Sequence, residues 1–328
     1  GDILGEWTTP TYEHAGAGRG HIWRPIPATL QHLAALAFGR SGTVFRLLNV
    51  VLHLVNTALV LALSRRFGAT ALGSAAMALC FTLHAAVPDA VSWSSDVYDL
   101  AATTAALGAL AVGLGRGHSW ARLGGVASLT LVAALCKESA VAIVPVIAIA
   151  AALRGLGWRR ALGAGLASGA AAVAYFGLHH VVTAQGYADA AGQTPIAHQA
   201  LAGLAAVGWL LVPPSRAPMA HLFNPAEYTE AAVGIAVLAA LLSVAALTWR
   251  RAPMASRALL AATAAWCLLL SPAAVGTPMI GVQPVRYAYL PLAACAVLMG
   301  GAGDVWPRPH LGIWVAGLWA LLSAPRAV

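Results

Sequence analysis

Runs of about 20 apolar residues recur along the whole chain, and they restrict its fold more than any other feature. Hydrophobic residues make up 60% of the 328 residues, charged residues only 9%, and the mean hydropathy is +0.76. A soluble domain does not need this much apolar sequence, and a signal peptide would not recur up to the C-terminus. We therefore predict an all-α polytopic membrane protein, a single transmembrane domain over residues 1–328. The predicted spans, about ten, are 44–64, 69–87, 98–115, 121–136, 139–153, 161–181, 229–248, 258–275, 288–303 and 310–325.

The charged residues predict how this bundle is oriented. Arginine is concentrated in alternate connections between the predicted spans, which the positive-inside rule assigns to the cytoplasmic face. The other connections hold every acidic residue except Asp304. The net charge of +8 is then a topology signal, and we predict no nucleic-acid partner. The arginines of the predicted cytoplasmic face are Arg65, Arg66, Arg116, Arg122, Arg154, Arg159, Arg160, Arg250, Arg251, Arg257 and Arg308. The acids of the predicted outer face are Asp2, Glu6, Glu13, Asp89, Asp96, Asp99, Glu138, Asp189, Glu227 and Glu230.

Two outer connections are long enough to carry structure of their own. The first is residues 1–43, which includes the apolar stretch 27–39, and the second is 182–228, which includes 200–212. Both stretches are too short to cross a bilayer, and Pro213 and Pro214 end the second. A crossing at 200–212 would also move every later basic loop to the other side. We therefore predict that both stretches are helices in the outer interface.

One lysine stands among eighteen arginines, and it interrupts an apolar run. Lys137 directly precedes Glu138 in the segment LTLVAALCKESAVAIVPV. Lysine offers a compact point charge that suits a phosphate or a single carboxylate, whereas arginine offers a planar fork of donors. A charged pair at membrane depth is costly unless it faces a polar cavity, so this pair indicates a functional site. The alternative is a pair of charges that reaches the surface at a helix end.

The densest polar cluster lies in the predicted outer connection FTLHAAVPDAVSWSSDVYDL, residues 81–100. It contains His84, Asp89, Trp93, Asp96 and Asp99, and its carboxylates could orient a hydroxyl group, bind a metal ion or face water. The four cysteines lie in apolar segments without metal-ligand spacing. We therefore predict no metal site and no cofactor, with a divalent ion at the carboxylates as the alternative.

Among the arginines of the predicted acidic face, Arg24 and Arg286 stand beside aromatic residues and depart from the charge pattern. Such arginines suit a phosphate or an anionic headgroup, and the alternative is an ion pair with a local carboxylate. Asn49 and His53, four residues apart in the first predicted span, raise a similar choice. His53 could titrate, but we favour a hydrogen bond to Asn49 or to a neighbouring span.

Five short motifs occur in a fixed order along the chain: WRPI (23–26), LNVVLH (48–53), the 81–100 segment, CKES (136–139) and RYAYLP (286–291). They resemble Y-R-P-L, L-N-x-x-x-H, F-x-L-H-P-x-x-x-E-A-V-x-W-x-x-x-x-x-D-L, S-K-E-T and R-Y-L-Y-L-P in tetratricopeptide-repeat-containing O-mannosyltransferases. The resemblance is to the membrane half of these proteins and their bacterial relatives, which belong to the GT-C superfamily of polyprenyl-phosphate-sugar-dependent glycosyltransferases. The chain departs from the third motif at Ala85, where the family has proline, and at Asp89, where it has glutamate.

This resemblance implies a GT-C-like helical bundle and an enzyme. It would move mannose or another hexose from a polyprenyl-phosphate donor to a hydroxyl of a protein, lipid or glycan, with inversion. The active site would face outward from a bacterial inner membrane. The family's essential acid follows its first span, which matches Asp2 here, so we also expect a span ending just before Gly1, about 11 in all. The alternatives are a proton-coupled or lipid-handling transporter and a non-catalytic membrane scaffold.

The resemblance also implies roles for individual residues. The general base would be Asp2, with Glu6 beside it, and the donor phosphate would be held by Lys137, Arg24 and Arg286. The residues expected to support the acceptor or its loop are His84, Asp89, Asp99 and Glu138.

Overall fold

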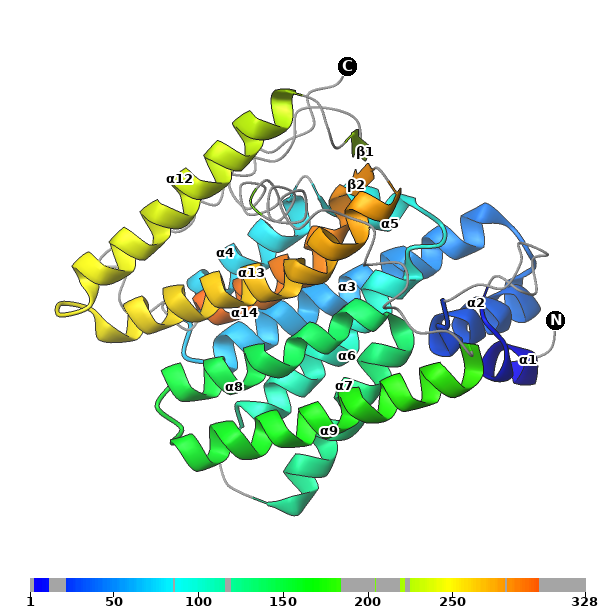
Figure 1. The fold of residues 1–328 in the computed structure, drawn as a ribbon, viewed down its shortest axis with the longest axis horizontal. Coiled ribbons are helices and arrows are strands. Elements are labelled where there is room, and N and C mark those ends of the chain that lie inside the picture. Colours follow the sequence, from blue (N-terminus) through cyan, green and yellow to red (C-terminus); the bar gives the residue numbers. More distant parts are fainter. Residues whose placement is uncertain are drawn as a thin grey trace.

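A computed structural model describes residues 3–11, 22–84, 86–115, 119–183, 204, 219–221, 225–280 and 282–300. The described chain is almost entirely helical (Figure 1). Its helices are α1 (Ile3–Thr8), α2 (Pro25–Phe38), α3 (Gly42–Arg66), α4 (Ala71–Leu83), α5 (Val87–Ser92), α6 (Val97–Gly113), α7 (Trp120–Cys136), α8 (Ile143–Leu153), α9 (Trp158–Thr183), α12 (Pro225–Thr248), α13 (Pro253–Ile280) and α14 (Tyr289–Gly300). Short 3₁₀ helices, η2 (Glu138–Ala142) and η3 (Val285–Ala288), precede α8 and α14.

A helical membrane protein is confirmed at this level. Within the described residues, three helices are long and apolar enough to cross a bilayer: α3, α9 and the Pro253–Ser271 part of α13. Six of the other predicted spans also coincide with apolar helices, some of them short. The shortest are α4, α8 and α14, with 13, 11 and 12 residues. A helix of 13 residues is only about 20 Å long, so crossing by these three stays a prediction. The predicted span 310–325 lies outside the described residues.

Helices α6 and α14 form the centre of the bundle. Fourteen of the 17 residues of α6 are buried, as are 11 of the 12 residues of α14. Both are mostly apolar on every side, as expected of helices enclosed by others, and the main exception is Asp99 in the first turn of α6. Helix α14 packs on α3, α4, α6 and α13, while α6 packs on α3 and α7. The two helices therefore fix the positions of the chain segments that meet at their ends.

The outer helices have the polarity expected of a protein in lipid. On α3 the buried face includes Asn49, His53 and Asn56, at helical spacing, while Val51 and Leu54 are exposed. A soluble helix would place these residues the other way round. On α9 the buried face is built largely from alanine and serine, which let membrane helices approach closely. The closest such approach is at Gly300 on α14, where an added Cβ would lie 2.5 Å from Ser64 Cβ on α3.

The described chain also contains a small sheet, which the all-α prediction did not include. Strands β1 (Met219–His221) and β2 (Val282–Pro284) pair antiparallel, with Ala220 opposite Gln283. Strand β2 directly precedes η3, so β1 lies at the same end of the bundle. Helix α9 also runs toward that end, since its Tyr175 stacks on Trp23 with ring centroids 6.3 Å apart. The chain thus leaves α9 and returns to β1 at one end, although 200–212 itself falls outside the described residues except for Leu204.

The first predicted interfacial stretch, 27–39, coincides with helix α2. Proline at the start of α2 suits a helix N-terminus, since its missing N–H has no partner to lose there. Helix α2 packs on α1, α3 and α7. Its Gln31 Nε2 donates to the Ser94 carbonyl at 3.2 Å, which ties α2 to the connection between α5 and α6.

Candidate functional site

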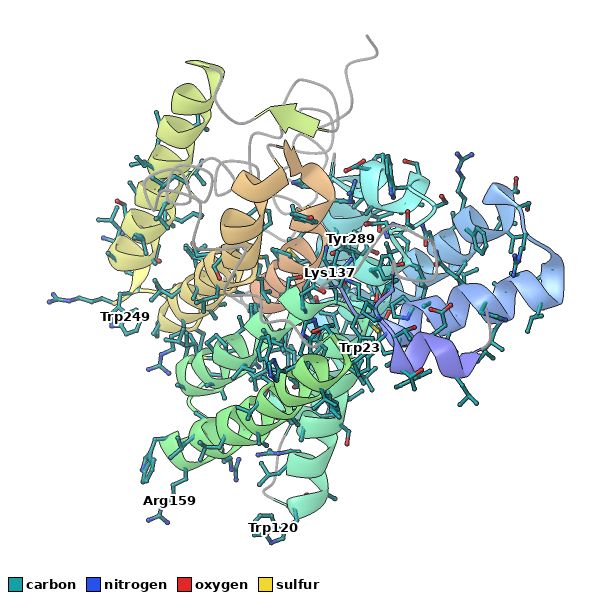
Figure 2. All side chains as sticks on the ribbon, turned by 45° about the vertical axis from the view of Figure 1, so that its right-hand side comes forward. Trp23, Trp120, Lys137, Arg159, Trp249 and Tyr289 are labelled. Atoms are coloured by element: carbon teal, nitrogen blue, oxygen red, sulfur yellow. The ribbon has the colours of Figure 1, made fainter. Side chains whose placement is uncertain are left out.

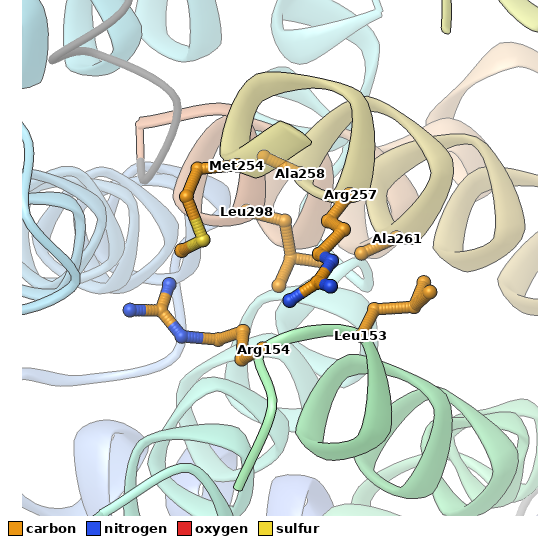
Figure 3. A pocket seen from close by; sticks show the side chains of 7 residues that line it. All are labelled: Leu153, Arg154, Met254, Arg257, Ala258, Ala261 and Leu298. Carbon is orange, nitrogen blue, oxygen red and sulfur yellow. The ribbon is translucent and has the colours of Figure 1, made fainter. Parts of the chain in front are cut away.

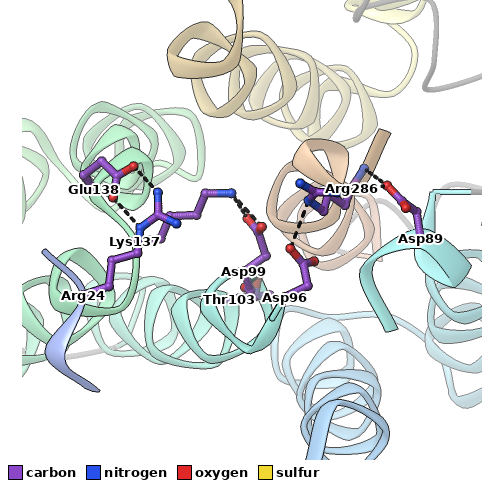
Figure 4. Close-up of polar contacts among 8 residues, drawn as sticks. All are labelled: Arg24, Asp89, Asp96, Asp99, Thr103, Lys137, Glu138 and Arg286. Atoms are coloured by element: carbon purple, nitrogen blue, oxygen red, sulfur yellow. Dashed lines mark hydrogen bonds and ion pairs between the residues drawn. The ribbon is translucent and has the colours of Figure 1, made fainter. Parts of the chain in front are cut away.

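The candidate site lies where several helices begin or end together. Helices α2, α6, α8 and α14 begin at this end, and α7 and α13 end there. Charged residues are concentrated in the short connections and first helical turns at this end, whereas the rest of these helices is largely apolar. Figure 4 shows that three of these connections, together with the start of α2, bring seven charged side chains into one row.

Lys137 occupies the C-cap of α7, in an extended backbone conformation. Its Nζ lies 2.5 and 2.6 Å from the two carboxylate oxygens of Asp99, in the first turn of α6. The ammonium group also lies 4.1 Å from the ring centroid of Tyr287, a cation–π contact. The lysine is only 6% exposed. It therefore does not reach the surface, and its partner is Asp99 rather than the adjacent Glu138.

Glu138 is paired instead with Arg24, the residue that precedes α2. The guanidinium Nε donates to Glu138 Oε2 at 2.8 Å, and a terminal guanidinium nitrogen donates to Oε1, so the pair is bidentate. Burial acts to raise the pKa of Glu138, but Arg24 outweighs it and lowers the pKa to about 2. The guanidinium also lies 5.0 Å from the ring centroid of Tyr98. Both groups are therefore charged, and Glu138 holds Arg24 in place rather than Lys137.

Arg286, in η3, contacts two aspartates of the 81–100 segment. Its Nε lies 3.2 Å from Asp96 Oδ1, and its backbone N–H donates to Asp89 Oδ2 at 3.2 Å. The guanidinium Nη1 is 3.9 Å from the same Asp89 oxygen. The indole ring of Trp93 lies 5.0 Å from the guanidinium carbon. Arg286 thus links the connection before α6 to the connection before α14.

The row of charges is balanced to within one unit. In the described part of the chain it holds three cations and four carboxylates, which gives a formal charge of −1 if all are ionised. Burial, reinforced by the nearby Asp99, raises the pKa of Asp96 well above its ordinary value. Asp96 can therefore hold a proton, because Asp99 is already committed to Lys137. A phosphate group would have to exchange with one of the carboxylates to reach a cation.

A buried polar network lies beneath this row, between α3, α6 and α14. His53 Nδ1 and the Tyr289 hydroxyl are 2.8 Å apart, and Asn56 Nδ2 donates to the Leu100 carbonyl at 2.9 Å. Asn49 Nδ2 donates to the Trp93 carbonyl at 2.8 Å. The prediction that His53 bonds to a neighbouring helix is confirmed. The network fixes the helices that carry Asp99 and Arg286.

The remaining predicted site residues lie around the row rather than in it. His84 is buried at the C-cap of α4, where its Nδ1 accepts the Ala86 N–H at 3.0 Å and so supports the turn into α5. Glu6 lies on α1, partly exposed, with no described contact to the row. Helix α1 is held to α2 by Trp7 Nε1, which donates to Thr29 Oγ1 at 3.1 Å. Asp2, the predicted general base, lies outside the described residues.

Sequence reasoning gave no specific role to two side chains of the row. Asp96 was noted only as one acid of a polar segment, and Tyr287 only as part of a motif. The three-residue spacing of Asp96 and Asp99 at the start of a helix was a usable signal, because such residues share a face. The contact between Lys137 and Tyr287 had no such signal, since 150 residues separate them.

Comparison with known proteins gives a partial similarity. No protein-family model and no solved structure matches the chain. The chain is similar to protein O-mannosyl-transferase Tmtc1 of Drosophila melanogaster, with 33% identity over 139 residues. The match covers 41% of this chain and spans only 16% of that protein's length. This distant similarity suggests a membrane glycosyltransferase, which agrees with the coarser part of the sequence prediction.

Proposed function

We propose that this chain is a membrane glycosyltransferase that moves a sugar, mannose or another hexose, from a polyprenyl-phosphate donor to an acceptor hydroxyl. The observation that carries the proposal is the row of charges. The only lysine of the chain is buried beside two arginines at one end of an apolar bundle. All three cations belong to motifs that resemble those of O-mannosyltransferases, and the partial similarity to Tmtc1 supports the same class.

The three cations would hold the donor phosphate. Transfer of the sugar leaves a lipid phosphate that carries an additional negative charge, and buried cations stabilise such a charge strongly. Arg286 is the cation that can most readily exchange its carboxylate partner for the donor phosphate, because its partner Asp96 can take up a proton and lose its charge. Lys137 would then contribute from the adjacent position, backed by the ring of Tyr287. Donor binding would in this case be accompanied by proton uptake.

The reaction would be a single displacement. The acceptor oxygen attacks the anomeric carbon, the bond from that carbon to the phosphate oxygen breaks, and the configuration inverts. The acceptor's proton passes to a carboxylate within hydrogen-bond reach. Asp2 is the proposed base, with Glu6 as the alternative on the same segment. This assignment is supported by α1, which follows Asp2 and packs on α2, the helix that begins beside Arg24.

Reconstituted protein would test the proposal directly. The protein is reconstituted in liposomes with polyprenyl-phosphate mannose as the donor and a peptide that carries hydroxyl groups as the acceptor. Product formation is followed by mass spectrometry. We expect the transferred sugar to have the anomeric configuration opposite to that in the donor, as determined by nuclear magnetic resonance. Nucleotide-linked mannose serves as the control donor and should give no product. Transfer from the nucleotide donor, or retention of configuration, would contradict the proposal.

A further inference from the structure

A shallow hollow lies at the opposite end of the bundle from the row of charges, where α8 ends, α13 begins and α14 approaches its end. It is lined by Leu153, Arg154, Met254, Arg257, Ala258, Ala261 and Leu298 (Figure 3). Arg154 is the C-cap of α8, and the turn continues through Gly155 with a φ of 70°. A Cβ placed on Gly155 would lie 3.8 Å from Arg257 Nη1, so both arginines flank the same turn.

Neither guanidinium of this hollow has a carboxylate partner among the described residues. Arg154 donates to the Phe67 carbonyl at 3.0 Å and lies 4.7 Å from the Phe67 ring centroid. Arg257 lies 5.8 Å from the ring centroid of Trp249. An arginine has five N–H donors, so most donors of both side chains remain available. The hollow is therefore lined by two partly buried positive charges that no described side chain neutralises.

The other wall of the hollow is apolar. Met254, Ala258, Ala261 and Leu298 lie around the arginines, and Figure 3 shows the Arg257 guanidinium directed into the space between α8 and α13. Two cations next to an apolar wall fit an anion that carries a hydrocarbon chain better than they fit a free ion. Basic pockets between membrane helices bind phospholipid headgroups in this way.

We infer that this hollow binds the phosphate group of an anionic phospholipid, with the acyl chain against the apolar wall. The inference does not depend on the proposed function, because the hollow is at the other end of the helices from the row of charges. Its phosphate would bridge Arg154 and Arg257 and so tie α8 to α13. Occupancy should therefore stabilise the bundle as well as mark a binding site.

Lipid titration with a matched pair of variants tests the inference. Purified protein in neutral detergent is titrated with phosphatidylglycerol or phosphatidylcholine, and bound lipid is counted by native mass spectrometry. Arg257→Gln removes one charge from the hollow, and Arg250→Gln removes one charge from an exposed position in the connection that precedes α13. We expect Arg257→Gln to weaken binding of phosphatidylglycerol roughly fivefold or more. Arg250→Gln and phosphatidylcholine binding should change little.

Two further arms separate the possible sources of the phosphate. Glycerol 3-phosphate and inorganic phosphate carry the same anion without a chain, and we expect neither to compete at concentrations where the lipid saturates. Arg257→Lys keeps the charge at the tested position and should keep most of the binding, which shows that the loss in Arg257→Gln comes from the missing charge and not from misfolding. Equal losses in Arg257→Gln and Arg250→Gln would overturn the inference, because they would show a diffuse attraction. Competition by inorganic phosphate at those concentrations would overturn it as well.

Discussion

The two ends of the bundle carry opposite kinds of electrostatics. At the end with the row of charges, the three cations of the row are each paired with a carboxylate and lie wholly or partly in the protein interior, whereas Arg40 and Arg46 near the start of α3 are exposed. At the other end the described charges are all arginines, and several, such as Arg159 and Arg250, are exposed. Figure 2 shows Trp120, Arg159 and Trp249 at the periphery of the bundle, well away from Lys137 and Tyr289. The row of charges is therefore the part of the described chain where buried cations and carboxylates are paired, whereas the other end buries one unpaired arginine, Arg122, whose Nη1 donates to the Gly115 carbonyl.

That cost is a reason to assign function to the paired end. Buried ion pairs contribute little net stability, because desolvation offsets their attraction, and apolar replacements of similar size are often as stable. The exposed arginines of the other end, such as Arg159 and Arg250, need no such explanation, since water can solvate them. One buried pair and two partly buried pairs in one row therefore point to binding or catalysis, or to a requirement for one specific arrangement of helices.

The largest expected effect follows from breaking the central pair. Lys137→Met leaves Asp99 buried without its cation, and we expect a loss of about 3–5 kcal/mol in stability together with loss of sugar transfer. The double variant Lys137→Met/Asp99→Asn removes both charges and should recover most of the stability. If Lys137 holds the donor phosphate, transfer stays absent in the double variant. Thermal unfolding in detergent and the transfer assay are the two measurements.

A matched control comes from the other end of the bundle. Arg159→Gln should change stability by no more than about 0.5 kcal/mol, because the side chain is exposed. Recovery of transfer in the double variant would show that Lys137 has a structural role only. A stability loss at Arg159 as large as that at Lys137 would remove the contrast between the two ends.

The proposed base gives the next largest effect. Asp2→Asn keeps the shape of the side chain but removes its basicity, and we expect transfer to fall by about 10²–10⁴-fold. Donor binding and thermal stability should be nearly unchanged, which separates this variant from Lys137→Met. Glu6→Gln is the matched control on the same segment. If Glu6→Gln shows the larger loss in the transfer assay, the base is Glu6.

The ion pair between Glu138 and Arg24 predicts a specific pH dependence of stability. Its pKa is lowered from 4.5 to about 2, so its contribution to stability is present above about pH 4.5 and is lost as the pH falls toward 2. Glu138→Gln should therefore cost about 2 kcal/mol at pH 7, and the difference from the parent protein should shrink between pH 4.5 and 2. Thermal unfolding at several pH values measures this.

Within the same row, Asp96 predicts a pH dependence of stability opposite in direction to that of Glu138. Its raised pKa means that its protonated form is favoured in the folded protein, so any stability it contributes is lost as the pH rises. Asp96→Asn should be at least as stable as the parent protein near neutral pH, and the parent should gain stability relative to this variant on acidification, whereas it loses stability relative to Glu138→Gln. The same pH trend in both variants would contradict the assignment of Asp96 as the carboxyl that holds a proton.

The positions of the helices could be predicted well, and the pairing of the charges could not. Apolar length predicted α3 and α9 closely, because a segment's own composition determines whether it forms a membrane helix. The contacts of Lys137 with Asp99 and of Arg24 with Glu138 join residues 38 and 114 positions apart. Such pairs depend on how helices pack, and no local pattern records that packing. The gathering of the cations at one end was predictable, since topology alone places their connections there.

The ends of the helices were the less predictable part of the fold. The predicted spans 139–153 and 288–303 begin as 3₁₀ helices in the structure, because polar residues at these points bond across the bundle rather than along the chain. Arg286 in η3, for example, uses its backbone N–H for Asp89. Hydropathy shows where a chain is apolar, but it does not show where an α-helix is replaced by a 3₁₀ helix beside a functional site.

The smallest expected effect on the fold is also the clearest check of the two ends. Ser92→Cys and Arg250→Cys each place a thiol at an exposed position, the first beside the row of charges and the second in the α12–α13 connection. Stability should change by less than about 0.5 kcal/mol in both. In sealed membrane vesicles an impermeant maleimide should label the two from opposite sides, with Arg250→Cys on the cytoplasmic side by the positive-inside rule. Labelling of both from one side would mean that residues 200–212 cross the membrane, and the interfacial prediction for that stretch would be wrong.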